Sequence, residues 1–172
     1  MKKFLIALFI SLSFFAGAQA SGAKFGYVDT DYIMGQIPEY KAAQNELDKL
    51  SVQWQKEIDD KQFELDQLYR NFESEKVMLS EELLKKREDD IFNREKALRD
   101  LQKKRFGFEG DLFKRRQELV MPIQDKVFNA VQKIAVARQY DLILDKSEGI
   151  TIIFADPKLD RSDDILKELL GK

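Results

Sequence analysis

Between residues 38 and 139, apolar residues recur mostly every three or four positions against a background of Lys, Glu, Asp and Gln. This spacing predicts long amphipathic helix. A single straight helix of ~100 residues would span ~150 Å, which does not fit a compact domain of this size. The sequence therefore predicts that the helix folds back on itself as a hairpin.

The apolar pattern is interrupted near residues 77–80, where Ser80 precedes Glu81 and Glu82. Serine followed by acidic residues is typical of a helix N-terminus, so we place the hairpin tip there. Apolar residues then face one another across the seam: Phe72 with Leu84, Leu65 with Ile91, Ile58 with Leu98, and Trp54 with Leu101. The second stripe continues through Phe108 and Leu112, which predicts an uninterrupted return helix. Residues 40–116 form the predicted coiled-coil hairpin arm.

Short elements flank the arm on both sides. Strands are predicted at residues 24–29, 140–145 and 150–154, the last because it is rich in β-branched residues. A short helix is expected at residues 31–36 with Thr30 as its cap. A final helix ends at Leu170, capped by Asp160 or Ser162 and followed by Gly171. The predicted fold class is α+β, mostly α, with the hairpin projecting from a small body made of residues 21–39 and 117–172.

This body is too small for a robust core and leaves open strand edges, so oligomerisation is expected. Pro122 lies inside an otherwise helical pattern just beyond the base of the arm. A proline there removes one backbone hydrogen bond and bends the helix. Two interpretations remain open: a hinge between arm and body, or a tolerated kink without a mechanical role.

The first twenty residues have the three parts of a secretory signal peptide. Lys2 and Lys3 precede an apolar run, and the run is followed by Ala18-Gln19-Ala20. The apolar run is too short for a confident transmembrane helix, although an uncleaved anchor is the alternative. Without cysteine, the usual bacterial lipid anchor is excluded. Residues 1–20 are thus predicted to direct export to the periplasm.

Composition argues against several classes of function. The chain has no histidine and no cysteine, which removes Cys–His and Ser–His nucleophiles and the usual zinc sites. No phosphate-binding glycine motif is present, and no cofactor, metal or catalytic residue is predicted. Removing Lys2 and Lys3 changes the net charge from −2 to about −4, unlike a general nucleic-acid binder. A carboxylate hydrolase is the remaining, weak enzyme hypothesis.

The order of these segments resembles the Skp (OmpH-like) periplasmic chaperones over the whole mature chain. The matching segments are the strand with Gly26-Tyr27-Val28-Asp29, the stretch Pro38-Glu39-Tyr40-Lys41-Ala42-Ala43, the charged hairpin, residues 140–146, and the Asp-rich last helix. The resemblance implies a homotrimer with three arms around a cavity, acting as an ATP-independent holdase for unfolded outer-membrane proteins. The best-known member is strongly basic, whereas this chain is mildly acidic. Lipopolysaccharide binding is therefore not carried over, and contact with a membrane surface stays open.

The alternative function is a coiled-coil spacer or tether of the cell envelope. A tether needs no strand-containing body built from both chain ends, so the predicted body favours the chaperone. The trimer contacts are expected around six body residues: Phe25, Tyr27, Leu142, Leu144, Ile150 and Ile152.

Several apolar residues of the arm are left over once the seam is assigned: Val52, Phe63, Tyr69, Leu83, Phe92 and Phe106. Exposed apolar patches usually mark interaction surfaces, so these residues are the predicted client-binding set, with Phe63 and Phe92 on a common flank. The other interpretation is that they lie across the groove and widen the seam.

Overall fold

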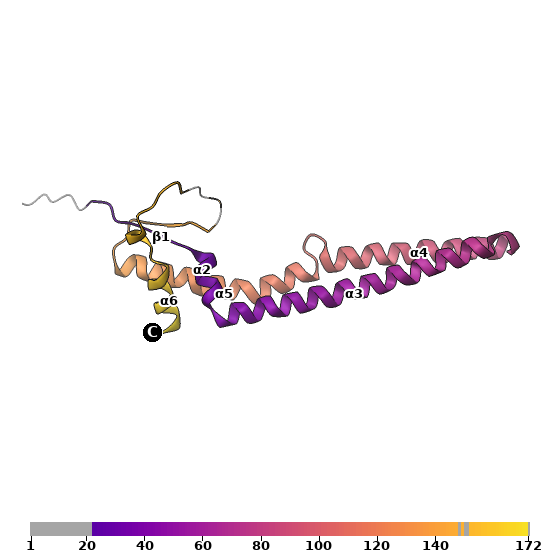
Figure 1. Cartoon of the computed structure of the whole chain (residues 1–172), viewed down its shortest axis with the longest axis horizontal. Coiled ribbons are helices and arrows are strands. Elements are labelled where there is room, and N and C mark those ends of the chain that lie inside the picture. The colour runs from indigo at the N-terminus through magenta and orange to yellow at the C-terminus, as the bar shows by residue number, and fades with distance from the viewer. Residues whose placement is uncertain (1–21, 148, 150–151, 172) are drawn as a thin grey trace, which may run out of the picture.

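A computed structural model describes residues 22–147, 149 and 152–171, so the predicted signal peptide lies outside the described residues. A long helical hairpin extends from a small body (Figure 1). The outgoing helix α3 spans Pro38–Glu75, the 3₁₀ turn η2 spans Lys76–Met78, and the returning helix α4 spans Glu81–Phe106. The fold class predicted from the sequence, mostly helical with a small sheet, is confirmed.

The ends of these helices follow from local sequence. Pro38 occupies the first turn of α3, where a missing backbone N–H has no cost. The Ser80 hydroxyl accepts a hydrogen bond from the Leu83 amide at 3.4 Å, with Glu81 and Glu82 in the first turn of α4. Both predicted helix starts are confirmed. Lys103, Lys104 and Arg105 in the last turn of α4 complement the negative end of the helix dipole.

The seam of the arm is a separate apolar cluster. Ile58 and Leu65 of α3 are buried with Ile91 and Leu98 of α4, and three partly buried residues pack against them: Leu68, Phe72 and Leu101. The cluster thus contains both members of two predicted pairs. Because only one layer of side chains is buried between two helices, the rest of the arm surface faces solvent.

The expectation of an uninterrupted return helix is wrong. Helix α4 ends at Phe106, residues 107–110 form a loop, and α5 spans Asp111–Ala137 (Figure 1). A side chain at Gly107 would place its Cβ 2.3 Å from the Lys103 carbonyl oxygen, and one at Gly110 would lie 2.9 Å from the Gly107 oxygen. Helix α5 continues through Pro122.

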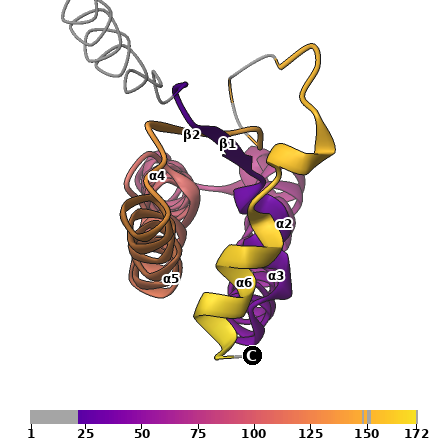
Figure 2. The ribbon, with the colours of Figure 1, turned by 90° about the vertical axis from the view of Figure 1, so that its left-hand side faces the viewer.

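The body contains a two-stranded parallel sheet made from both ends of the chain. Strand β1 spans Phe25–Val28, β2 spans Leu142–Asp145, and Phe25 pairs with Leu142. Figure 2 shows the strands side by side with the helices on one side of them. These two predicted strands are confirmed. The third is not, because residues 152–154 form no strand, and residues 150 and 151 lie outside the described part.

Two short helices complete the body. Helix α2 spans Thr30–Gln36, and Asp29, not the predicted Thr30, caps it by accepting a hydrogen bond from the Tyr32 amide at 2.8 Å. The 3₁₀ turn η3, Pro157–Leu159, leads to α6, Ser162–Leu170, which ends at Gly171 in the left-handed conformation. Neither Asp160 nor Ser162 occupies the cap position, which belongs to Arg161.

The body core lies where α2, α5, α6 and the first turns of α3 meet. Ile33 and Ile165 are fully buried at its centre, and the remaining members come from all of these elements and β1: Val28, Met34, Ile37, Ala43, Leu47, Val120, Ile123, Val127, Ala130, Ile134 and Leu166. The described residues therefore form two apolar clusters, one in the body and one in the arm.

Candidate functional site

The predicted client-binding residues are distributed around the arm. Val52, Phe63 and Tyr69 lie on α3, whereas Leu83, Phe92 and Phe106 lie on α4. All six are exposed, including Phe63 at 60% and Phe92 at 59%. The arm therefore carries large apolar side chains in solvent along much of its length.

The helix period separates these residues into different sides. Phe63 lies two positions before the buried Leu65, about 200° around α3, so it projects away from α4. Val52 is eleven positions before Phe63 and shares this outer side. Phe92 follows the buried Ile91 by one position, about 100° from the seam. The structure thus does not place Phe63 and Phe92 on one flank.

Tyr69, Phe92 and Phe106 share a side of the hairpin. The Tyr69 hydroxyl donates a hydrogen bond to Glu95 across the seam, and this bond raises the pKa of Tyr69 above its ordinary value. Phe92 lies one helical turn before Glu95 on α4. The ring of Phe106 packs edge-on against Trp54 with centroids 6.4 Å apart. This side is accordingly aromatic, with one polar bridge between the helices.

Arg105 connects three helices where the arm meets the body. Its guanidinium donates to Asp111 of α5 at 2.7 Å and to Glu57 of α3 at 3.1 Å, and it lies 4.9 Å from the centre of the Trp54 ring. The hydrogen bond to Asp111 contributes most to raising the pKa of Arg105. Nearer the body, Arg115 donates twice to Glu46, at 2.6 and 3.0 Å. The Arg105 pairs thus join α4 to α3 and α5 at the helix break, and the Arg115–Glu46 pair joins α5 to α3 beyond it.

The outer face of the sheet carries four of the six predicted trimer residues, of which Tyr27 is buried within this chain. Phe25 and Tyr27 alternate with Gly26 and Val28, so they share a face, and their strand partners Leu142 and Leu144 share it with them. Phe25 and Leu142 are 51% and 46% exposed, whereas Val28 points into the core. Of the other two predicted residues, Ile152 is half-buried in a loop and Ile150 lies outside the described residues.

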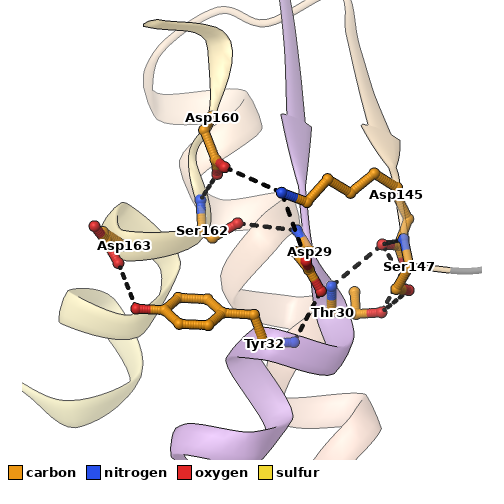
Figure 3. Close-up of polar contacts among 9 residues, drawn as sticks. Asp29, Thr30, Tyr32, Asp145, Ser147, Asp160, Ser162 and Asp163 are labelled. Carbon is orange, nitrogen blue, oxygen red and sulfur yellow. Dashed lines mark hydrogen bonds and ion pairs between the residues drawn. The ribbon is translucent and has the colours of Figure 1, made fainter. Parts of the chain in front are cut away.

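A polar network lies where both strands of the sheet end, and it joins residues 29–32 to residues 145–163 (Figure 3). The Asp145 carboxylate accepts hydrogen bonds from the amides of Thr30 at 3.2 Å and Ser147 at 3.0 Å, and from both hydroxyls. Burial alone would raise the pKa of Asp145, but these hydrogen bonds outweigh burial and lower it.

The neighbouring charges of the network are also paired. Lys146 lies 3.5 Å from Asp29 and 3.6 Å from Asp160, which offsets the effect of burial and raises the pKa of the ammonium. The Ser162 hydroxyl accepts from the Asp29 amide at 2.9 Å. Because these polar groups pair with one another, the network holds the two ends of the body together.

Comparison with known proteins identifies the family to which this architecture belongs. The family model for outer membrane protein (OmpH-like) matches residues 24–169, nearly all of the chain described above. The chain belongs to the OmpH-like family. A search of curated proteins finds no significant match.

A solved structure has the same fold as this OmpH-like chain. It is from Caulobacter crescentus CB15 and is described as a candidate outer membrane chaperone (OmpH-like). The TM-score is 0.68 at 15% sequence identity, over 87% of this chain and 85% of the other. At this identity the likeness concerns the fold.

Two further observations bear on the site of this OmpH-like protein. No group of three or more acidic side chains in the described residues is arranged to hold a metal ion. Within the same part of the chain, no helix is long and apolar enough to cross a bilayer.

Sequence reasoning missed one surface feature, the exposed ring of Phe108 in the loop after α4. This ring is 94% exposed and stacks on Phe113 of α5, with centroids 6.4 Å apart and planes 25° from parallel. The spacing of the apolar residues predicts instead that Phe108 lies in the seam of the hairpin. The signal that was available is the pair Gly107 and Gly110, two strong helix breakers three positions apart.

Proposed function

We propose that this protein is an ATP-independent periplasmic holdase chaperone. It binds unfolded outer-membrane proteins in a cavity between the arms of a homotrimer and prevents their aggregation during transit. The observation that carries this proposal is the two-helix arm, whose seam buries one apolar layer while aromatic side chains remain in solvent on its other sides. Membership of the OmpH-like family supports it.

The proposed client contacts are shallow and repeated. The outer side of α3 offers Val52 and Phe63, and the adjacent side offers Tyr69, Phe92 and Phe106, with Leu83 closer to the tip. Charged residues separate these apolar side chains along both helices. An unfolded client can then make many weak contacts in different poses and retain conformational entropy that a single tight site would remove.

The proposed trimer uses the outer face of the sheet. Phe25 and Leu142 each remain about half exposed there, and neither edge strand extends beyond four residues. Contact with a neighbouring protomer would cover these side chains and the unpaired strand edges. The body residues Tyr27, Leu144, Ile150 and Ile152 belong to the same proposal, and Pro122 is proposed as the hinge that lets each arm adjust to its client.

The experiment is suppression of aggregation of an urea-unfolded outer-membrane β-barrel protein diluted into buffer without ATP. The double variant Phe63→Ser with Phe92→Ser removes one ring from each client-contacting side. We expect it to suppress aggregation several-fold less well than wild type, with unchanged helicity and particle mass. The matched control is Gln67→Ser with Asn93→Ser, two exposed polar positions on the same helices. Equal suppression by wild type and the aromatic double variant would exclude these rings from client binding.

The same assay separates the holdase from an envelope tether. A tether binds fixed partners through its ends and has no reason to protect unfolded β-barrel proteins. Wild-type protein that leaves aggregation unchanged at a severalfold excess would contradict the chaperone proposal as a whole.

A further inference from the structure

The loop between α4 and α5 presents an aromatic pair at the junction of arm and body. Phe108 is 94% exposed, and its ring stacks nearly parallel on Phe113, which is itself 43% exposed. Neither ring belongs to the body core or to the arm seam. The two rings therefore form a small apolar platform on the protein surface. Folding of this chain does not require this platform.

The backbone of the loop holds this platform in one position. The Gly110 amide donates to the Gly107 carbonyl at 2.9 Å, and the Lys114 amide donates to the Gly110 carbonyl at 3.0 Å. Glu109 between them is in the left-handed region at φ 55°. Arg105 in the last turn of α4 and Asp111 at the start of α5 form an ion pair at 2.7 Å across the loop. A ring presented on such a fixed loop loses little conformational freedom when it binds.

Basic residues flank the loop that carries the platform on both sides in the sequence. Lys103 and Lys104 lie in the last turn of α4 and Lys114 in the first turn of α5. All three are exposed, and within the described residues none of them forms an ion pair. The nearby acidic residue Asp111 is already bound to Arg105, which leaves Glu109 as the one uncommitted carboxylate of the loop. Residues 103–114 thus carry four basic and two acidic side chains, on a chain whose net charge is −2.

We propose that this aromatic–basic platform binds short peptide segments that carry an aromatic side chain next to carboxylates. The aromatic side chain of the segment would stack on Phe108, extending the existing pair, since offset and edge-on aromatic contacts are favourable. Carboxylates beside it would approach the three lysines. These carboxylates are those of Asp or Glu side chains in the segment, and a free chain terminus is the alternative source that the test distinguishes. This binding site is separate from the arm surfaces proposed to hold unfolded clients.

The test measures peptide binding by fluorescence anisotropy with the full-length mature protein. The probe is a labelled peptide with one Phe flanked by two Asp residues. Two companion peptides replace Phe by Ala or Asp by Lys, and a third places Phe at a free or an amidated C-terminus. The protein variants are Phe108→Ser and Lys103→Gln with Lys104→Gln. Val136→Ser, which removes an exposed apolar side chain from the far part of α5, is the matched control.

We expect Phe108→Ser to weaken binding of the acidic aromatic probe about threefold to tenfold, while Val136→Ser leaves it unchanged. The lysine variant should bind more weakly at low salt and lose part of the salt dependence seen with wild type. The Ala-containing and Lys-containing peptides should bind more weakly than the probe. Free and amidated C-terminal peptides that differ in affinity would identify the terminus as the preferred source of the carboxylate.

Equal affinity of wild type and Phe108→Ser for the probe would overturn the proposal. A change in particle mass on Phe108→Ser would also overturn it, because the platform would then be a contact between copies of this chain. The readout is direct binding of a short peptide, not suppression of aggregation. A failure here is therefore distinguishable from failure of the holdase proposal.

Discussion

Arg105 is the residue on which the arm–body junction depends. It contacts Glu57, Asp111 and the Trp54 ring at once, and only 22% of its side chain is exposed. Replacing it with Met leaves two carboxylates without their partner, and we expect a loss of about 1–3 kcal/mol in the free energy of unfolding. Urea denaturation followed by circular dichroism measures this loss.

The control for this prediction is Arg99→Met. Arg99 forms an exposed i,i+4 ion pair with Glu95 on α4 and should cost less than about 0.5 kcal/mol. Equal effects of the two substitutions would show that Arg105 contributes no more than an ordinary surface charge.

Asp145 makes the stability of the body depend on pH. Burial would raise the folded-state pKa of the Asp145 carboxyl, but hydrogen bonds from Thr30 and Ser147 lower it. The ionised carboxylate therefore stabilises the folded state fully at pH values above the unfolded-state pKa. This stabilisation is lost as pH falls through the folded-state pKa. At pH 7 we expect Asp145→Asn to be less stable than wild type by about 1–2 kcal/mol. The difference should close as pH falls below about 4.

Thermal unfolding of wild type and Asp145→Asn between pH 3 and 7 measures this dependence. Asp125→Asn, at an exposed position of α5, is the control and should follow wild type at every pH. A stability difference that stays constant down to pH 3 would contradict the proposed role of the Asp145 carboxylate.

At this scale, sequence predicted the residues whose partners are local. Pro38 and Ser80 act within one helical turn, and both were identified. Local sequence predicts Thr30 as the cap of α2, but its hydroxyl contacts Asp145, 115 positions away. Such a contact depends on the tertiary fold, and local spacing contains no information about it.

At the scale of elements, the break between α4 and α5 depends on its glycines. Any side chain at Gly107 would approach the Lys103 carbonyl to 2.3 Å, so Gly107→Ala must displace the end of α4. We expect a loss of about 1–3 kcal/mol in unfolding free energy. Gly35→Ala is a contrasting control, since its Cβ meets nothing within 4 Å inside α2 and should stabilise by about 0.5–1 kcal/mol. Denaturant midpoints of both variants test the pair, and a neutral Gly107→Ala would argue against a fixed loop.

The seam gives a second prediction at this scale. Ile58 is buried between α3 and α4, and its replacement by Ala should cost about 2–5 kcal/mol in the stability of the hairpin. Hydrogen exchange should become faster in residues 50–105 and remain slow in α5 and α6. Lys61→Ala, on the exposed surface one turn away, is the control. Equal acceleration in arm and body would show that the two clusters unfold as one unit.

The seam was predictable because its pattern is long and regular, whereas the break was not. Leu101, Phe108 and Leu112 are spaced by seven and four residues, which is the spacing of a continuous helix. Similarly, residues 152–154 have the composition of a strand, but they form none, and the sheet of the described residues consists of β1 and β2. In both cases the local pattern of residues favours one element and the tertiary structure contains another.

At the scale of the whole molecule, a small body anchors a long arm. The body core draws on both chain ends, and the arm buries its own separate cluster. This division is consistent with the proposed holdase, in which the arm contacts clients and the body forms the contacts between protomers. It also means that changes on the outer sheet face should affect assembly without unfolding the arm.

The assembly prediction follows from the partial exposure of Leu142. This side chain lies on the outer face of the sheet opposite the body core and is 46% exposed in the single chain. In a single protomer, the Asp carboxylate of Leu142→Asp would remain in water. In the proposed trimer, the same carboxylate would be buried without a partner, which costs several kcal/mol of assembly free energy. We expect light scattering to give a trimer mass for wild type and a protomer mass for Leu142→Asp at micromolar concentration, with helicity retained. Val77→Asp, at the exposed tip of the arm, should remain trimeric. A wild-type protein with the mass of one chain and a folded circular dichroism spectrum would contradict the trimer, and a trimeric Leu142→Asp would place the contact elsewhere on the body.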